Sequence, residues 1–289
     1  MSSKKADLKR LVIFLLLAFT LTWIPWIAFN IIFGYSEWFE SGHYGILVLL
    51  LSFGPALANV LTRKLTNESW EDSKLHLNLK GNLKYYLIAF VIISVVGVLS
   101  GLQITFTYGS WNWDEITANA PFTAMLNTVL GTFASTPLFA FITFGEEFGW
   151  RGYMNDKMES LLGTVGTCIV GGIIWGVWHA PLTLCGHNYG TEQPFIGVLL
   201  MCLNCISSGM ILMWLTKKTG SVFPACIMHS MNNNGGTLVG NFLISGVPET
   251  LETTLLDELY LMLPQVIVAV VFLILMLRKK RLEKTSALC

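Results

Sequence analysis

Charged residues are scarce in this chain of 289 residues. They make up 12% of it, whereas an ordinary soluble domain has about 25%. The 18 basic and 18 acidic side chains cancel to a formal net charge of zero, so the chain lacks the positive surplus with which nucleic-acid-binding proteins neutralise phosphates. It also lacks the low hydrophobic content of a disordered chain, because 53% of its residues are hydrophobic.

Other features that would indicate a modular or disulfide-rich protein are missing as well. The sequence has no internal repeat, no low-complexity segment and no linker long enough to separate two domains. Its six cysteines are scattered, and the pair Cys202-x-x-Cys205 has no second pair beside it, as a zinc cluster or a disulfide framework would require. We therefore expect residues 1–289 to form a single membrane domain.

Long apolar segments are what the chain does have. A helix needs ~20 mostly apolar residues to cross the hydrocarbon core of a bilayer, and within lipid its backbone must satisfy its own hydrogen bonds. The sequence therefore predicts an all-α, polytopic membrane protein with about eight transmembrane helices. The expected spans are residues 11–33, 43–62, 85–106, 121–146, 163–184, 194–216, 221–244 and 259–277.

The basic residues are completely segregated between the two sets of loops. All 18 lie before the first span, in 63–84, 147–162 and 217–220, or after residue 277, whereas the loops 34–42, 107–120, 185–193 and 245–258 contain none. Loops rich in Lys and Arg stay in the cytoplasm. This distribution predicts eight spans with both termini cytoplasmic.

Ionisable residues inside the expected spans are confined to three of them. Such groups are costly in a membrane and are functional candidates by default. Residues three or four apart share a helix face, so Glu147 and Arg151 are expected to form an ion pair and to leave Glu146 without a local cation. The three motifs are Glu146-Glu147-x-x-x-Arg151, Trp175-x-x-x-His179, whose tryptophan we expect to stack over the histidine, and His229-x-x-x-Asn233.

These residue types suit the hydrolysis of a carbonyl bond. A carboxylate and an imidazole together can activate water, and a second imidazole with an amide can donate hydrogen bonds to a developing oxyanion. Structural interpretations also exist: an ion pair at a helix end, a packed histidine, and asparagines that join helices. The remaining histidines, His43, His76 and His187, are assigned ordinary positions in loops or at their edges.

In this order and membrane setting, the three motifs resemble the CPBP family of intramembrane proteases. That family includes the type II CAAX prenyl endopeptidases and the bacterial Abi proteins linked to bacteriocin processing and immunity. The resemblance implies that Glu146 activates water with His179, and that His229 and Asn233 form the oxyanion hole. It also implies that Glu147, Arg151 and Trp175 support the site, within a protease core at about 120–245. The prenyl endopeptidases have Phe where this chain has Trp175.

The resemblance implies an intramembrane endopeptidase of the glutamate type, without a cofactor. Its substrate would be a membrane-associated peptide or lipidated protein, either CAAX-type or bacteriocin/leader-type, and its partners would include membrane lipids but no nucleic acid. We expect a prokaryotic cell membrane and a cavity open to the cytoplasm. Three alternatives stay open: a zinc-dependent variant with Glu146, His179 and His229 as ligands, a non-catalytic immunity or scaffold protein, and a proton-coupled transporter.

The expected spans raise one geometric difficulty. On straight helices with a rise of ~1.5 Å per residue, Glu146 lies near the cytoplasmic end of its span, whereas His179 lies closer to the opposite side. The two can meet only if a helix is tilted or kinked, or begins outside the membrane. Pro137, or the glycines at 163, 166, 171 and 172, are the positions at which we expect such a change.

Overall fold

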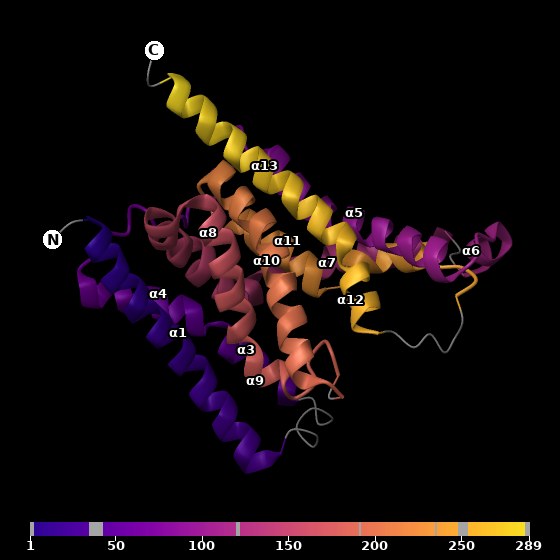
Figure 1. The fold of residues 1–289 in the computed structure, drawn as a ribbon, viewed down its shortest axis with the longest axis horizontal. Helices are drawn as coiled ribbons and strands as arrows, with labels where there is room; N and C mark the ends of the chain where they lie inside the picture. The colour runs from indigo at the N-terminus through magenta and orange to yellow at the C-terminus, as the bar shows by residue number, and fades with distance from the viewer. Residues whose placement is uncertain are drawn as a thin grey trace.

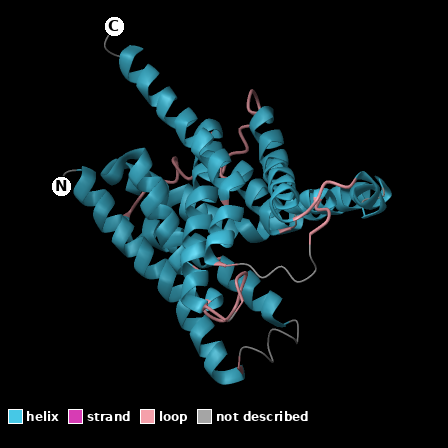
Figure 2. Cartoon of the chain, turned by 45° about the vertical axis from the view of Figure 1, so that its right-hand side comes forward, coloured by secondary structure: helices cyan, strands magenta, loops and turns pink. Residues whose placement is uncertain are grey.

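The computed structural model describes residues 3–34, 43–119, 122–190, 192–234, 236–247 and 254–286, which contain helices and no strand (Figures 1 and 2). Loops 34–42 and 245–258 of the sequence analysis lie partly outside these residues. The elements are α1 (Ser3–Phe33), α3 (His43–Ser52), α4 (Gly54–Thr66), α5 (Leu83–Tyr108), α6 (Trp113–Asn119), α7 (Phe122–Gly149), the π-helix η1 (Trp150–Met154), α8 (Asn155–Trp178), α9 (Ala180–Thr183), α10 (Pro194–Thr219), α11 (Phe223–Asn233), the 3₁₀ helix η2 (Gly236–Leu243), α12 (Leu255–Leu261) and α13 (Leu263–Ser286).

The apolar helices agree with a membrane protein, but the number of spans differs from the prediction. Five described helical segments are long and apolar enough to cross a membrane, or six if α12 and α13, which are bent by 45°, form one span. The expected spans 121–146 and 163–184 are parts of one helical run, Leu126–Trp178. The expected span 221–244 is divided into the 11-residue α11 and η2. Eight separate spanning helices are therefore not confirmed.

The continuous run from α7 into α8 removes the geometric difficulty at Glu146. The helix does not end there, because it continues through η1 into the first residues of α8. The reversal comes at Gly163, whose φ of 70° and ψ of 178° break the helix; glycine adopts such a φ without the steric cost that a Cβ adds. Residues 164–178 then return to the level of Glu146. The prediction that a glycine in this region changes the chain direction is confirmed at Gly163.

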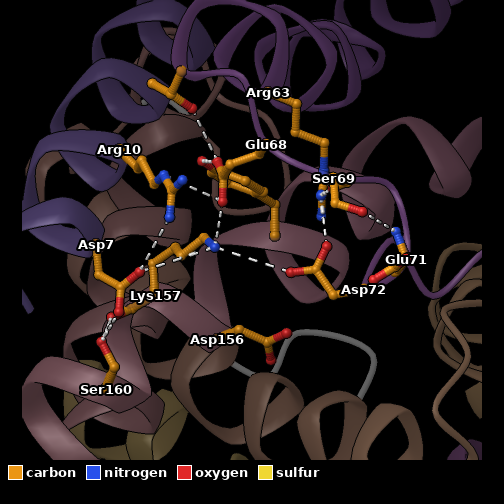
Figure 3. A network of polar contacts seen from close by, with 12 residues as sticks. Asp7, Arg10, Arg63, Glu68, Ser69, Glu71, Asp72, Asp156, Lys157 and Ser160 are labelled. Atoms are coloured by element: carbon orange, nitrogen blue, oxygen red, sulfur yellow. Dashed lines mark hydrogen bonds and ion pairs between the residues drawn. The ribbon is translucent and has the colours of Figure 1, made fainter. Parts of the chain in front are cut away.

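Three segments that carry basic residues meet in one network of polar contacts (Figure 3). The carboxylate of Glu68, which follows α4, lies 2.6 Å from Nζ of Lys157 in α8 and 3.4 Å from Nε of Arg10 in α1. In the same network Nη1 of Arg63 lies 2.6 Å from Oδ1 of Asp72. Three segments that are distant in the sequence are thus held together at the end where α1 begins.

The opposite end is joined by contacts between the loops that lack basic residues. Oγ of Ser245 donates to the carbonyl oxygen of Ser110 over 2.9 Å, and the hydroxyl of Tyr108 donates to Asp257 over 2.7 Å. The segregation of charge in the sequence therefore corresponds to two physical ends of the helical assembly. The beginning of α1 and the end of α13 lie on the same side of it (Figure 1).

The Glu68 network should make stability depend on pH. Burial opposes ionisation of Glu68, but hydrogen bonds from Lys157 and Tyr153 and the charges of Lys157 and Arg10 outweigh burial and lower its pKa below 4.5. A carboxylate whose pKa is lower in the folded than in the unfolded state stabilises the folded state at pH values above its unfolded-state pKa. This contribution is lost as the pH falls through the folded-state pKa. Between pH 7 and pH 3.5 we expect the melting temperature of Glu68→Gln to fall by roughly 2–4 °C less than that of wild type. This difference corresponds to the loss of ~1 kcal/mol of stability in wild type. An equal fall would contradict the prediction.

Close helix packing holds α8 in place against α10. At Gly172 and Gly176 an added Cβ would lie 2.4 Å from Cα of Ile206 and 2.5 Å from Cα of Cys202. At these distances the α8 backbone has room for the hydrogen atom of a glycine but not for a Cβ. The small residues therefore allow α8 to approach α10 closely, as small residues do between membrane helices, and this contact positions the end of α8 that carries His179.

Candidate active site

A cavity of about 590 Å³ lies among α1, α3, α7, α8, α9, α10 and α11. It is lined by four residues for which the resemblance implies a catalytic role: Glu146, His179, His229 and Asn233. Glu146 is only 6% exposed and His229 is buried, whereas Asn233 is exposed. The structure thus brings residues from three separate helices of the sequence to one cavity.

Glu146 and His179 face each other without a direct hydrogen bond. The distance between Oε2 of Glu146 and Nε2 of His179 is 3.9 Å. Trp175 contacts both residues: its indole Nε1 donates to Oε2 of Glu146 over 2.7 Å, and its carbonyl oxygen lies 2.8 Å from Nδ1 of His179. A carbonyl oxygen can only accept, so Nδ1 carries the hydrogen and Nε2 is the nitrogen that faces Glu146.

The position of Trp175 differs from the expected stacking over His179. The two ring centroids lie 5.8 Å apart and the planes are inclined by 57°. The indole instead donates a hydrogen bond to the carboxylate of Glu146 in α7. The fixed contacts of Trp175 are therefore a hydrogen bond to Glu146 and a carbonyl contact with the imidazole.

Glu147 lies at the centre of a fully buried ion pair. Its Oε1 lies 3.1 Å from Nη1 of Arg151 and 2.9 Å from Nδ1 of His229, so the expected i,i+4 ion pair is confirmed. Glu147 is 0% exposed, and the guanidinium of Arg151 lies 4.0 Å from the ring centroid of Trp175. The acid, the base and the tryptophan together fix the ring orientation of His229.

The three consecutive asparagines at the end of α11, the last of which caps the helix, divide between the cavity and the helix packing. Asn232 and Asn233 line the cavity, whereas Nδ2 of Asn234 donates to the carbonyl oxygen of Thr132 in α7 over 3.0 Å. Asn233 stands four residues after His229 and shares the cavity with it, as the spacing predicts. The interpretation of these residues as connectors between helices therefore holds for Asn234.

Comparisons with known proteins find similarity over the region that contains this site. The model of the family "Type II CAAX prenyl endopeptidase Rce1-like" matches residues 126–235, the region that contains all three motifs. A CAAX prenyl protease 2 of Methanococcus maripaludis is 27% identical over 232 residues, which cover 76% of this chain and 82% of the relative. Over the region of its three motifs, the chain is therefore similar to the CAAX prenyl endopeptidases. This similarity and the apolar helices together indicate an integral membrane protein and an intramembrane protease.

Several residues of this endopeptidase cavity were missed in the sequence analysis. Asn204 and Ser208 of α10 line it, and Nε2 of Gln265 in α13 donates to both of them, over 2.7 Å and 2.9 Å. Their spacing of four residues within an apolar segment was a signal that could have found them. The contact with Gln265 joins two helices that are distant in the sequence, and no local pattern indicates it.

His187 is a second departure from the sequence analysis, which placed it in an ordinary loop position. The structure places it in the cavity lining, and burial lowers its pKa below the usual value. A lowered pKa favours the neutral imidazole at neutral pH. His187 therefore belongs with the residues that a substrate in this cavity would meet.

The donor set does not fit a metal site. Among the residues that the structure describes, no group of three or more His, Cys, Asp or Glu side chains is arranged to hold a metal ion. The candidate ligand Glu146 accepts the indole hydrogen of Trp175, and His229 directs Nδ1 at Glu147 rather than at Glu146. We therefore derive no catalytic step through zinc. Catalysis without a cofactor stays a prediction.

Proposed function

We propose that this protein is an intramembrane endopeptidase of the glutamate type, in which Glu146 and His179 activate the attacking water. The observation that carries the proposal is the separation of 3.9 Å between Oε2 of Glu146 and Nε2 of His179 at the wall of a 590 Å³ cavity. This distance is too long for a direct hydrogen bond. It allows one water oxygen to contact both groups.

The surroundings of this pair favour general base catalysis by Glu146. The indole of Trp175 holds one carboxylate oxygen in place, and the carbonyl oxygen of Trp175 keeps the hydrogen of His179 on Nδ1. Nε2 then presents its lone pair to the water and orients it. The carboxylate takes a proton from the water as the oxygen attacks the scissile carbonyl, and afterwards passes that proton to the leaving amine.

His229 and Asn233 are proposed to stabilise the oxyanion of the tetrahedral intermediate. Because Nδ1 of His229 donates to Glu147, Nε2 carries a hydrogen only in the doubly protonated imidazolium. The carboxylate of Glu147 supplies the counter-charge for this form, while Arg151 holds the carboxylate. The side-chain amide of Asn233 supplies the second donor. Fixed donors of this kind stabilise charge that develops during the reaction.

The proposed substrate is a membrane-associated peptide or protein, either CAAX-type or bacteriocin/leader-type. The printed name of the Methanococcus maripaludis relative supports the CAAX class, and apolar cavity residues such as Val48, Leu49 and Ile142 suit a lipid chain or an apolar peptide segment. Residues 120–245 are proposed as the protease core. Residence in a prokaryotic membrane stays a prediction. An opening of the cavity toward the cytoplasm also stays a prediction.

Cleavage by the purified full-length protein tests this function. A panel of fluorescence-quenched peptides should include a farnesylated CAAX peptide and apolar peptides without a lipid, each incubated with and without EDTA and 1,10-phenanthroline. We expect cleavage of at least one peptide at a rate that neither chelator lowers. Loss of cleavage with chelator, restored by zinc, would favour the zinc-dependent variant. Absence of cleavage across the panel would favour a scaffold or a transporter.

A further inference from the structure

The wall that α10 contributes to the catalytic cavity carries two polar side chains within an apolar stripe. The cavity-lining residues of this stripe are Met201, Asn204, Cys205, Ser208 and Leu212, and their spacing of three or four residues places them on one face of the helix. The amide of Asn204 and the hydroxyl of Ser208 are its hydrogen-bonding groups. A few polar groups among apolar ones are what fixes the orientation of a ligand in a pocket.

Asn204 lies close to the level of the proposed catalytic pair. α8 and α10 approach each other so closely at Gly176 that an added Cβ there would lie 2.5 Å from Cα of Cys202. Gly176 follows Trp175, the residue that contacts both members of the pair, and Cys202 stands two positions before Asn204. The α10 backbone at Asn204 is therefore near the part of α8 that holds the pair in place.

Gln265 of α13 contacts this wall through its amide nitrogen. Nε2 lies 3.3 Å from the carbonyl oxygen of Asn204 and 2.7 Å from Oγ of Ser207. A carbonyl oxygen can only accept, and the hydroxyl of Ser207 already donates within α10, to the carbonyl oxygens of Leu203 and Asn204. Both neighbours therefore require a donor, so the nitrogen of the Gln265 amide, rather than its oxygen, faces α10.

This orientation of Gln265 also fixes the amide of Asn204. Nε2 of Gln265 lies 2.7 Å from Oδ1 of Asn204 and 2.9 Å from Oγ of Ser208. Because Nε2 has two hydrogens and no lone pair, it shares these hydrogens among oxygens that all accept. The oxygen of the Asn204 amide is thus engaged with α13, whereas its Nδ2 has no hydrogen-bond partner among the described residues. Nδ2 is free to donate into the cavity that Asn204 lines.

We propose that Asn204 is a substrate-binding residue whose Nδ2 donates to a backbone carbonyl oxygen of the bound peptide, and that Gln265 is the positioning residue that directs this donor into the cavity. The inference rests on the proposed function for the identity of the ligand as a peptide. A peptide that leaves water for an apolar cavity must satisfy its backbone carbonyl groups there. A donor held at this position sets the register in which the peptide lies beside the catalytic pair.

Peptide binding to Glu146→Gln protein in nanodiscs tests the role of Asn204 without cleavage. The probes are a fluorescein-labelled farnesylated CAAX peptide and the labelled apolar peptide Ser-Leu-Ala-Phe-Val-Ile-Gly, and the tighter binder is used throughout. We expect Asn204→Leu, which nearly keeps the size of the side chain, to raise Kd roughly tenfold, the effect of one lost hydrogen bond. In protein that cleaves, KM should rise by the same factor while kcat changes less than ~twofold. An unchanged Kd would overturn the inference.

The carbonyl oxygen can also be removed from the peptide. In a series of probes, one backbone amide at a time is replaced by an (E)-alkene, which keeps the shape of the bond without its carbonyl oxygen. One probe should lose about as much affinity as Asn204→Leu causes, and that probe should lose no further affinity in Asn204→Leu protein. If every alkene probe loses the same factor in both proteins, Asn204 binds no carbonyl group and the inference is wrong. Gln265→Glu serves in the same cycle if Asn204→Leu does not fold.

Two variants of Gln265 test its positioning role. A carboxylate only accepts hydrogen bonds, so in Gln265→Glu the amide of Asn204 turns Nδ2 toward α13, whereas the protonated acid donates as glutamine does. We expect Kd relative to the Glu146→Gln parent to rise roughly tenfold from pH 5 to pH 9. Gln265→Met, which removes the donor at every pH, should raise Kd roughly threefold at both. A ratio near 1 for both variants at pH 9 would overturn the positioning role.

Gln103→Glu is a matched control for these variants. Nε2 of Gln103 in α5 donates to the carbonyl oxygen of Tyr260 in α12 over 2.7 Å, which is also a contact between two helices, but Gln103 does not line the cavity. We expect Gln103→Glu to lower the melting temperature and to leave the Kd of the probe unchanged at both pH values. An equal rise in Kd would show that a lost helix contact, rather than the orientation of Asn204, weakens binding.

The outcomes separate this inference from the proposed function. Cleavage of panel peptides with unchanged Kd and KM in Asn204→Leu would support the endopeptidase and reject the role of Asn204. Probe binding that depends on Asn204, without cleavage of any peptide, would contradict the endopeptidase and support the peptide-binding residue.

Discussion

Glu146→Gln is expected to lower the rate of peptide cleavage by ~10³-fold, within the 10²–10⁴-fold range of general acid–base catalysis. The amide has nearly the same shape as the carboxylate, and its oxygen can still accept the indole hydrogen of Trp175. It cannot take a proton from water. The fold should therefore persist while the chemical step is lost. The measurement is kcat/KM for the best peptide of the panel, together with the melting temperature.

A matched control for this variant is Glu71→Gln. Glu71 is an exposed carboxylate in the loop after α4, so the substitution makes the same chemical change far from the cavity. We expect its kcat/KM to equal that of wild type. Full activity in Glu146→Gln protein would rule out the proposed general base. A similar loss in both variants would show that the effect does not come from the cavity.

Arg151→Met is expected to destabilise the protein by about 3–5 kcal/mol, the cost of breaking a buried ion pair by removing one partner. Glu147 is 0% exposed, and without the guanidinium its carboxylate keeps only the contact with Nδ1 of His229. Its Oε2 has no hydrogen-bond partner within the described structure, so no other group there can replace the lost contact. The contact of Arg151 with the Trp175 ring is lost as well. Equilibrium unfolding in detergent measures the change.

A double-mutant cycle distinguishes the ion pair from simple packing. In Glu147→Gln/Arg151→Met the unpaired charge is absent, so the double variant should be less destabilised than the sum of the two single variants. Lys64→Met, which removes an exposed cation from the end of α4, should change stability by less than ~0.5 kcal/mol. Additive effects in the cycle would contradict a coupled pair.

The expected geometry at the site was correct where it depended on spacing along one helix. The pair Glu147–Arg151 and the common cavity of His229 and Asn233 follow from residues four apart. The same reasoning misplaced Trp175, which was expected over His179. Its indole reaches Glu146 on another helix instead, and a distance of this kind depends on how two helices pack.

The span count shows the same limit. Hydropathy separated residues 121–146 from 163–184, because polar residues lie between them. The backbone nevertheless continues as one helical run through the π-helix at Trp150 and reverses only at Gly163. Hydropathy measures the preference for lipid, whereas the continuity of a helix depends on backbone dihedral angles. The change of direction could be expected from the glycines, but its position could not.

By itself, the sequence determined the membrane class, the separation of charge between two sets of loops, and the three motifs of the endopeptidase. These properties depend on composition and on local spacing, both of which are present before the chain folds. Only the tertiary structure decided that Trp175 holds Glu146 and that Glu147 holds His229. Each of these results joins segments that are distant in the sequence, and their distances depend on helix packing at Gly172 and Gly176 and on the reversal at Gly163.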